Sequence, residues 1–142
     1  MLFRSVVTAA RGWIGTSYLH QASVKGAGCD CLGLLRGVWR EVFGAEPEVV
    51  PPYTMDWAEP QGIEVLLGAA RRHLVEKPVA DAAPGDVLVF RMRAGAVAKH
   101  VGLMSGQAGF IHSFSGHGVV ESALTEAWRR RVVGCFGFNE RR

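Results

Sequence analysis

Two cysteines, Cys29 and Cys31, stand one residue apart in the stretch GAGCDCLGLLRG, residues 26–37. Such a pair could bind a metal, form a disulfide or include one reactive thiol. A structural zinc site needs about four ligands, and the only other cysteine, Cys135, lies alone far along the chain. A disulfide between Cys29 and Cys31 would close a strained ring. Two interpretations are left open: one reactive thiol, or two cysteines that pack as small apolar side chains.

Of the two thiols, Cys31 has the better position for nucleophilic chemistry. It follows Asp30, a residue type favoured at a helix N-cap, so we expect Cys31 in the first turn of a helix. Unpaired backbone N–H groups and the positive end of the helix dipole stabilise a thiolate there, which predicts a lowered thiol pKa. Cys29 precedes the cap in a glycine-bounded segment that we expect to be a loop.

A thiol nucleophile needs a base, and the base needs a partner that orients it. The chain has five candidates: His20, His73, His100, His112 and His117. His73 lies beside two arginines in a predicted helix, so we expect it to face solvent. His100 and His112 fall in two neighbouring predicted strands, and a three-residue turn at 106–108 would pair residue 105 with 109 and residue 102 with 112. His100 and His112 would then lie diagonally on one face, about 7 Å apart at the backbone.

The elements that must position these residues follow from hydrophobic periodicity. Apolar residues at helical spacing predict three helices, over 3–14, 31–43 (with Gly44 as C-cap) and 62–75. Residues 16–29 read as a loop, and 45–61 read as a proline-rich surface connection. A turn and β-rich run at 84–90, with further runs at 100–106, 109–114, 118–122 and 131–138, predict an antiparallel sheet. Helices followed by closely spaced strands indicate an α+β fold.

Composition limits the remaining function classes. The 142 residues predict one domain over 1–142, and a net charge of +3 with scattered basic residues argues against nucleic-acid binding. No apolar run approaches the roughly 18 residues of a membrane span, so we expect no membrane partner. The N-terminal stretch reads as an amphipathic helix rather than an export signal, which predicts synthesis in the cytoplasm. Three cysteines do not make a disulfide scaffold.

Four motifs in this order resemble the NlpC/P60 cell-wall cysteine peptidases: DCLGLL after GTSY, PGDVLVF, HVGLMSG and FIHS. The resemblance runs from about residue 3 to 138. It implies a papain-like α+β fold in which N-terminal helices pack on an antiparallel sheet and the nucleophile lies at a helix N-terminus. By motif, Cys31 matches the nucleophile, His100 the general base and His112 the residue that orients it. Tyr18 matches a tyrosine beside the oxyanion site, and Asp30 matches the aspartate that caps the helix.

The resemblance further implies hydrolysis of peptidoglycan stem peptides, often between D-glutamate and diaminopimelate or lysine, without a metal or other cofactor. Leu32 departs from the family, which usually has serine there, and LHQASVKGAG after GTS-Tyr18 departs as well. Both departures put substrate preference in doubt, and Leu32 is therefore a candidate substrate-binding residue. The subset carried by phage tails and gene transfer agents is the nearest analogue, which implies tail or baseplate partners and action in the periplasm or cell wall.

Two alternatives stay open at this stage. One is a structural or wall-binding tail component that keeps the fold without cleaving. The other is an amidase or acyltransferase of the same fold, although the order of Cys31 before His100 favours the peptidase. The stretch PPYTMDWAEPQG, residues 51–62, could line a substrate groove, dock a partner or be a plain surface loop.

Overall fold

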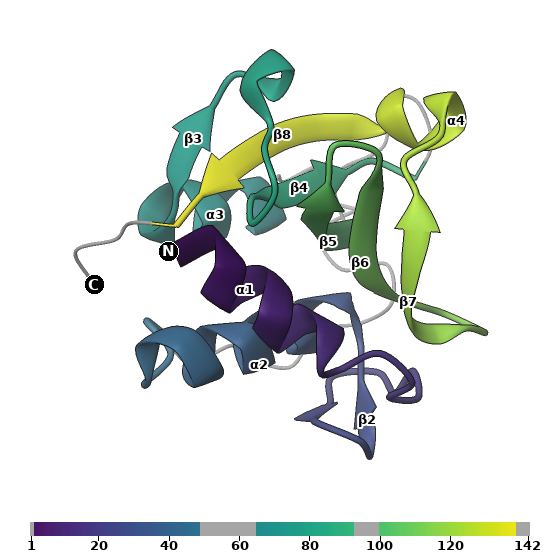
Figure 1. Cartoon of the computed structure of the whole chain (residues 1–142). Helices are drawn as coiled ribbons and strands as arrows, with labels where there is room; N and C mark the ends of the chain where they lie inside the picture. Colours follow the sequence, from purple (N-terminus) through teal and green to yellow (C-terminus); the bar gives the residue numbers. More distant parts are fainter. Residues whose placement is uncertain (1, 49–64, 93–99, 139–142) are drawn as a thin grey trace.

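A computed structural model describes residues 2–48, 65–92 and 100–138 (Figure 1). The chain begins with helix α1 (Leu2–Arg11), a short ribbon of β1 (Ser23–Val24) and β2 (Gly28–Cys29), and helix α2 (Cys31–Phe43). Helix α3 (Val65–His73), strand β3 (Val75–Lys77) and the 3-10 turn η2 (Val79–Asp81) follow. The remaining elements are β4 (Val87–Phe90), β5 (His100–Gly106), β6 (Gly109–Phe114), β7 (Gly118–Ala123), α4 (Glu126–Arg129) and β8 (Val132–Gly137).

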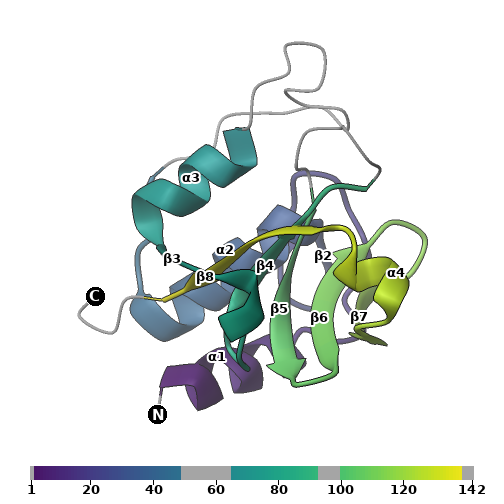
Figure 2. The same ribbon diagram turned by 90° about the horizontal axis from the view of Figure 1, so that it is seen from above.

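Apart from the β1–β2 ribbon, the six other strands form one antiparallel sheet in the order β3-β8-β4-β5-β6-β7. Helices α1 and α2 contact each other and pack under the sheet, where α2 contacts β5 and β6 (Figure 1). Helix α3 lies at the β3 and β8 end of the sheet, and α4 lies at the opposite end, near β7 (Figure 2). The α+β architecture predicted from the sequence is confirmed.

Each face of the sheet has its own apolar core. Under the helices, buried residues of α1 and α2 such as Val6 and Leu34 meet Val101 and Leu103 of β5. On the other face, Phe90, Phe110 and their neighbours form a second cluster. Because burial of apolar surface stabilises the folded state by about 25 cal/mol per Å2, these two clusters are the main source of the protein's stability.

The close packing of α2 against Trp13, in the turn that follows α1, depends on one glycine. A Cβ atom at Gly37 would lie 2.0 Å from the Trp13 ring, so a larger residue there would displace this ring from α2. Trp13 itself is buried, and its indole N–H donates to Glu41 at 2.7 Å. The packing of α2 therefore fixes where its N-terminus lies relative to the sheet.

The β5–β6 hairpin has the predicted register but a different turn. Leu103 pairs with Ile111 and Met104 with Phe110, a register that continues to residue 102 opposite 112. The predicted three-residue turn is wrong, because Gly106 pairs with Gly109 and the register shifts between Met104 and Gly106. A bulge thus takes up the extra residue, and the loop is the two-residue kind that strand twist favours.

Other boundaries also differ from the sequence predictions. Helix α1 ends at Arg11 rather than at residue 14, and Gly15 follows with a φ of 95°. The segment 16–29, predicted as a loop, contains the β1–β2 ribbon. Strand β3 and helix α4 were not predicted. Residues 49–64, which include most of the proline-rich connection and all of 51–62, lie outside the described residues.

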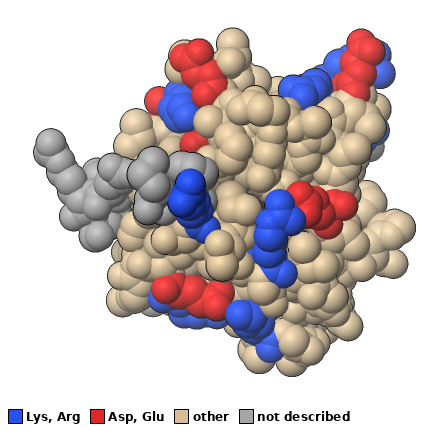
Figure 3. Space-filling model, in the orientation of Figure 1, with Lys and Arg blue, Asp and Glu red and all other residues tan. Residues whose placement is uncertain are grey.

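The described surface mixes charges of both signs. On the face in Figure 3, basic and acidic side chains lie next to one another rather than gathering by sign. Arg11 pairs with Glu121 at 2.5 Å, and Lys25 pairs with Glu41 at 3.1 Å. In the part of the chain that is described, no helix has the length and apolar character needed to cross a membrane.

Candidate active site

The helix that carries Cys31 begins where the sequence predicts. Asp30 has extended backbone angles, and its Oδ1 accepts a hydrogen bond from the backbone N–H of Gly33 at 2.7 Å. This bond satisfies one of the N–H groups that a helix start leaves unpaired. Asp30 is only 2% exposed, so its carboxylate is a buried structural anchor and Cys31 is the first residue of α2.

The second carboxylate oxygen of Asp30 holds a turn that precedes the helix. Oδ2 accepts from the backbone N–H of Gln21 at 2.7 Å, and His20 Nδ1 lies 3.8 Å from the same oxygen. Gln21 has a φ of 66°, a left-handed conformation that costs a non-glycine residue free energy. One buried carboxylate therefore joins a strained turn to the start of α2.

Steric crowding explains why the DCLG motif has a glycine at position 33. A Cβ atom at Gly33 would lie 1.8 Å from the carbonyl oxygen of Ala22. The Gly33 carbonyl also accepts from Ser23 Oγ at 2.6 Å. The turn and the first turn of α2 can approach this closely only because residue 33 has no side chain.

The Cys31 thiol is held neutral, against the sequence prediction. Backbone N–H groups of Val101, Leu32 and Cys31 itself face the sulfur and act to lower its pKa. Burial has the larger effect, however, and together with the nearby Asp30 charge raises the pKa of Cys31 to about 12. The prediction of a lowered pKa from the helix terminus is therefore wrong, because removal of water outweighs the helix dipole.

The other two cysteines lie in different surroundings. Cys29 and Cys135 are fully buried, whereas Cys31 is partly exposed. Cys29 belongs to strand β2 rather than to a loop, and its carbonyl accepts from Ser113 Oγ at 2.7 Å. Burial raises the pKa of both thiols. Among the three cysteines, only Cys31 is a partly exposed residue.

The two strand histidines form a hydrogen-bonded pair, as the predicted register requires. His100 Nε2 lies 2.8 Å from His112 Nδ1, and the two rings are nearly perpendicular at 77°. Burial lowers the pKa of His100 to about 3, with the His112 charge as a smaller cause. Burial also lowers the pKa of His112 to about 4, with the His117 charge as a smaller cause. Both imidazoles are therefore neutral near pH 7.

The hydrogen-bonded pair of histidines has a third partner, Ser122, which the sequence did not predict. Ser122 Oγ lies 2.9 Å from His112 Nε2. Ser122 is on β7, two residues from Val120, which is the register partner of His112. Residues two apart share a face of the sheet, so this register would have identified Ser122. The chain His100–His112–Ser122 fixes the orientation of both rings.

Aromatic side chains enclose the histidine pair on the second face of the sheet. Trp128 of α4 lies with its ring centroid 5.9 Å from that of His100 and 5.2 Å from that of His112. Phe114 stacks on His112 at 5.4 Å, and Phe90 and Phe110 complete the surroundings. These rings exclude water, which is the physical cause of the lowered histidine pKa values.

Tyr18 lies close to the candidate nucleophile. It forms an isolated parallel bridge with Cys29, two residues before Cys31. Burial, followed by the charges of Cys31 and Asp30, raises the pKa of Tyr18 to about 12. The phenol thus keeps its proton and remains a hydrogen-bond donor at neutral pH.

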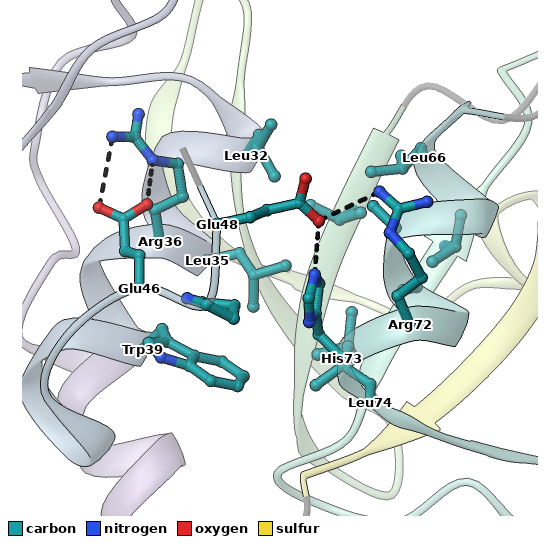
Figure 4. A pocket seen from close by; sticks show the side chains of 16 residues that line it. Leu32, Leu35, Arg36, Trp39, Glu46, Glu48, Leu66, Arg72, His73 and Leu74 are labelled. Atoms are coloured by element: carbon teal, nitrogen blue, oxygen red, sulfur yellow. Dashed lines mark hydrogen bonds and ion pairs between the residues drawn. The ribbon is translucent and has the colours of Figure 1, made fainter. Parts of the chain in front are cut away.

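Leu32 lines a pocket of about 280 Å3 between α2 and α3 (Figure 4). Most of its walls are apolar, and charged side chains of Arg36, Glu46, Glu48 and Arg72 also contribute. His73 is part of the wall, with its side chain only 22% exposed and bonded to Glu48, so the prediction that it faces solvent is wrong. Within the described ranges, no cluster of three His, Cys, Asp or Glu side chains could hold a metal ion.

A cysteine at the start of a helix, packed on an antiparallel sheet that carries a histidine pair, defines a papain-like α+β domain. The family model that matches the chain is that of the NlpC/P60 family, over residues 15–136. The chain belongs to this family, and the resemblance inferred from the motifs is confirmed.

Similar proteins agree with this assignment. The chain is 32% identical over 120 residues to the "Murein DD-endopeptidase MepS/Murein LD-carboxypeptidase" of Escherichia coli K12, covering 84% of this chain and 54% of that protein. It is 29% identical over 130 residues to the "Probable endopeptidase NlpC homolog" of Haemophilus influenzae, covering 91% and 58%. The chain thus spans about half the length of these relatives. The NlpC/p60 domain of the peptidoglycan hydrolase SagA matches with a TM-score of 0.68 at 22% identity, covering 97% of this chain and 100% of that domain.

Proposed function

We propose that residues 1–142 act as one catalytic domain that hydrolyses an amide bond in the stem peptide of peptidoglycan, with Cys31 as nucleophile. The hydrogen-bonded series from His100 through His112 to Ser122 carries the proposal, together with the backbone N–H of Val101, the residue after His100, which faces the helix-terminal Cys31 sulfur. The names of the relatives, a murein endopeptidase and a peptidoglycan hydrolase, support peptidoglycan as the substrate.

The first step of the reaction starts from a neutral Cys31 thiol and a neutral His100 imidazole. With the Cys31 pKa at about 12 and the His100 pKa at about 3, the free protein holds a thiol and an imidazole rather than an ion pair. His100 Nε2 bonds His112, so Nδ1 is the ring nitrogen that takes the thiol proton as the sulfur attacks the carbonyl. His100 then donates Nε2–H to His112 Nδ1, and His112 donates Nε2–H to Ser122.

The developing oxyanion has two candidate donors, the backbone N–H of Cys31 and the Tyr18 hydroxyl. Each such donor typically contributes about 3–4 kcal/mol to transition-state stabilisation. The proton on His100 passes to the leaving amine, which frees one product. Water then attacks the thioester, with His100 again as base, and releases the second product. His112 keeps the His100 ring in the required tautomer throughout.

We also propose where this reaction takes place and on which bond. The motif resemblance supports the bond between D-glutamate and diaminopimelate or lysine. It also supports delivery to the cell wall by a phage-like tail or gene transfer agent, with tail or baseplate proteins as partners. Action in the periplasm or wall follows from that delivery.

Digestion of purified peptidoglycan, followed by mass spectrometry of the soluble fragments, tests the proposal. We expect the wild type to release stem-peptide fragments with new free amines and Cys31→Ala to release none. Cys29→Ala, a matched change two residues away, should keep most activity. A dead Cys29 variant with an active Cys31 variant would contradict the assignment. Transferred acyl groups in place of free amines would identify an acyltransferase, and no release by any form would identify a structural component.

A further inference from the structure

The segment that precedes the candidate nucleophile, residues 15–30, is attached to strand β7 near its start. We call this segment the nucleophile arm. The Gly15 N–H donates to the Val119 carbonyl at 3.0 Å, and the Val119 N–H donates to the Thr16 carbonyl at 2.8 Å. Gly118 allows this close approach, because a Cβ atom there would lie 2.5 Å from the Thr16 oxygen. Two backbone hydrogen bonds therefore fix the beginning of the arm on β7, and strand β2 of the arm contacts the same strand (Figure 1).

The other end of the arm is attached to strand β6 by a buried side chain. Ser113 is only 1% exposed, and its hydroxyl donates to the Cys29 carbonyl at 2.7 Å. Burial raises the pKa of the Cys29 thiol, and a hydrogen bond with the Ser113 side chain opposes that rise. Ser113 and Val119 are register partners in the sheet. One pair of facing residues therefore holds both ends of the arm.

The Cys29 backbone connects this attachment to both candidate donors of the oxyanion site. Cys29 lies two residues before Cys31, whose N–H is one of these donors. The Cys29 N–H donates to the Ser17 carbonyl at 3.0 Å, and the Cys29 carbonyl also accepts from the Leu19 N–H at 3.1 Å. These two bonds flank Tyr18, whose hydroxyl is the other candidate donor. The hydrogen bond from β6 to this one carbonyl therefore acts on both donors.

Strand β6 also carries the residue that orients the proposed base. His112 directly precedes Ser113, and its ring bonds His100. Neighbouring side chains of a strand point to opposite faces of the sheet. Ser113 accordingly reaches the arm on the face covered by the helices, where Cys29 belongs to the apolar core. Two adjacent residues of β6 thus hold the base on one face and the nucleophile arm on the other.

We infer that Ser113 is a positioning residue for the reaction, and that its hydroxyl fixes Cys31 and the Tyr18 hydroxyl relative to the histidine pair. Ser113 is buried, so it acts through the Cys29 carbonyl and not on the substrate. Without the hydroxyl, this carbonyl still accepts from Leu19, so the protein stays folded while the end of the arm loses its attachment to β6. This inference rests on the proposed function, because it assumes that Cys31 attacks the substrate.

Hydrolysis of soluble stem peptides, prepared from purified peptidoglycan, measures the positioning. Ser113→Ala should lower kcat about tenfold at an unchanged KM, the factor that corresponds to the loss of one hydrogen bond in the transition state. Ser113→Thr keeps the hydroxyl and should regain most of the lost kcat. Ser105→Ala is the matched control with wild-type kcat, because Ser105 on β5 donates to Glu121 at the surface. Urea denaturation of each variant verifies that it is folded in the assay.

Hydrogen exchange of the backbone amides, followed by NMR, tests the attachment of the arm without any turnover. The Leu19 and Cys29 amides take part in the bonds next to the one that is lost. We expect both amides to exchange about fivefold faster in Ser113→Ala than in the wild type, because the end of the arm opens more often. Their exchange in Ser105→Ala should match the wild type.

Wild-type kcat in Ser113→Ala would overturn the positioning role, and so would a loss of kcat without faster exchange of the arm amides. Failure of the proposed function gives a different result. A wild type that cleaves peptidoglycan as fast as its Ser113→Ala variant would refute the positioning role alone. A wild type that cleaves nothing, with faster exchange of the arm amides in Ser113→Ala, would refute the hydrolase and support the attachment of the arm by Ser113.

Discussion

Replacement of Asp30 by alanine tests how the nucleophile is positioned. The buried carboxylate accepts one hydrogen bond from Gly33, which caps α2, and one from Gln21, which holds the preceding turn. Loss of an N-cap acceptor typically costs about 1 kcal/mol. Loss of the second, charged acceptor costs about 1.5–3 kcal/mol, and the left-handed turn at Gln21 then has no anchor.

The summed effect of Asp30→Ala is a loss of about 2.5–4 kcal/mol in the free energy of unfolding. For a domain of this size, that corresponds to a fall in melting temperature of about 10 °C. The stability of Asp30→Asn should fall between that of the wild type and that of Asp30→Ala. Its amide oxygen can still cap Gly33, but its NH2 group then faces the Gln21 N–H. Hydrolysis should decrease in the same order, since both bonds fix the position of Cys31.

Urea denaturation and the hydrolysis rate of soluble stem peptides measure the two effects. Asp81→Ala is the matched control, because Asp81 is exposed on η2 and its loss should change the free energy of unfolding by less than about 0.5 kcal/mol. An Asp30→Ala protein as stable as the control would refute the anchoring role. A variant that is destabilised but retains the full rate would show that the cap does not position Cys31.

Three further predictions concern the same site. Gly33→Ala should leave the protein unfolded or inactive, because its Cβ would lie 1.8 Å from the Ala22 oxygen, whereas Gly68→Ala, with 3.6 Å to its nearest neighbour, should melt at the wild-type temperature or above. Ser122→Ala should lower kcat about tenfold at unchanged KM, because the buried His112 ring loses its half-buried hydrogen-bond partner, a loss worth about 1–3 kcal/mol. Ser122→Thr should restore activity, and full activity of Ser122→Ala would argue against a role for Ser122. The lowered pKa values of His100 and His112, about 3 and 4, mean that protons bind the unfolded chain first as the pH falls below about 6.5. Stability should therefore be full above pH 6.5 and decrease toward pH 4, by up to about 1.4 kcal/mol per pH unit for each histidine, and a flat urea midpoint between pH 7 and 5 would contradict the burial of both rings.

Much of the site's framework could be predicted from local sequence signals. Asp30 before an apolar stripe predicted the start of α2, because N-capping depends on residues only three apart. The parity of His100 and His112 predicted a shared face, because the alternation of side chains along a strand survives a change of turn type. The order of the four motifs along the chain predicted the family, and the family model that matches residues 15–136 confirms it.

What the sequence could not provide depends on packing between distant segments. The pKa of Cys31 follows from how much water the folded chain excludes, and burial there outweighs the helix dipole that the sequence suggested. His73 was predicted to face solvent because it lies beside two arginines. In the structure it bonds Glu48, 25 residues away in the sequence, and forms part of a pocket wall. The short β1–β2 ribbon has no alternating pattern to reveal it, because its two-residue strands are too short to show one.

Selective alkylation most directly tests the claim that Cys31 is the nucleophile on a histidine relay. The protein is treated with iodoacetamide near neutral pH, and peptide mapping of each cysteine is compared with the loss of stem-peptide hydrolysis over time. We expect modification of Cys31 to match the loss of activity, because Cys29 and Cys135 are fully buried. His100→Gln should slow the alkylation of Cys31, since the base that takes the thiol proton is missing. Loss of activity that follows Cys29 or Cys135, or full activity with Cys31 alkylated, would contradict the account.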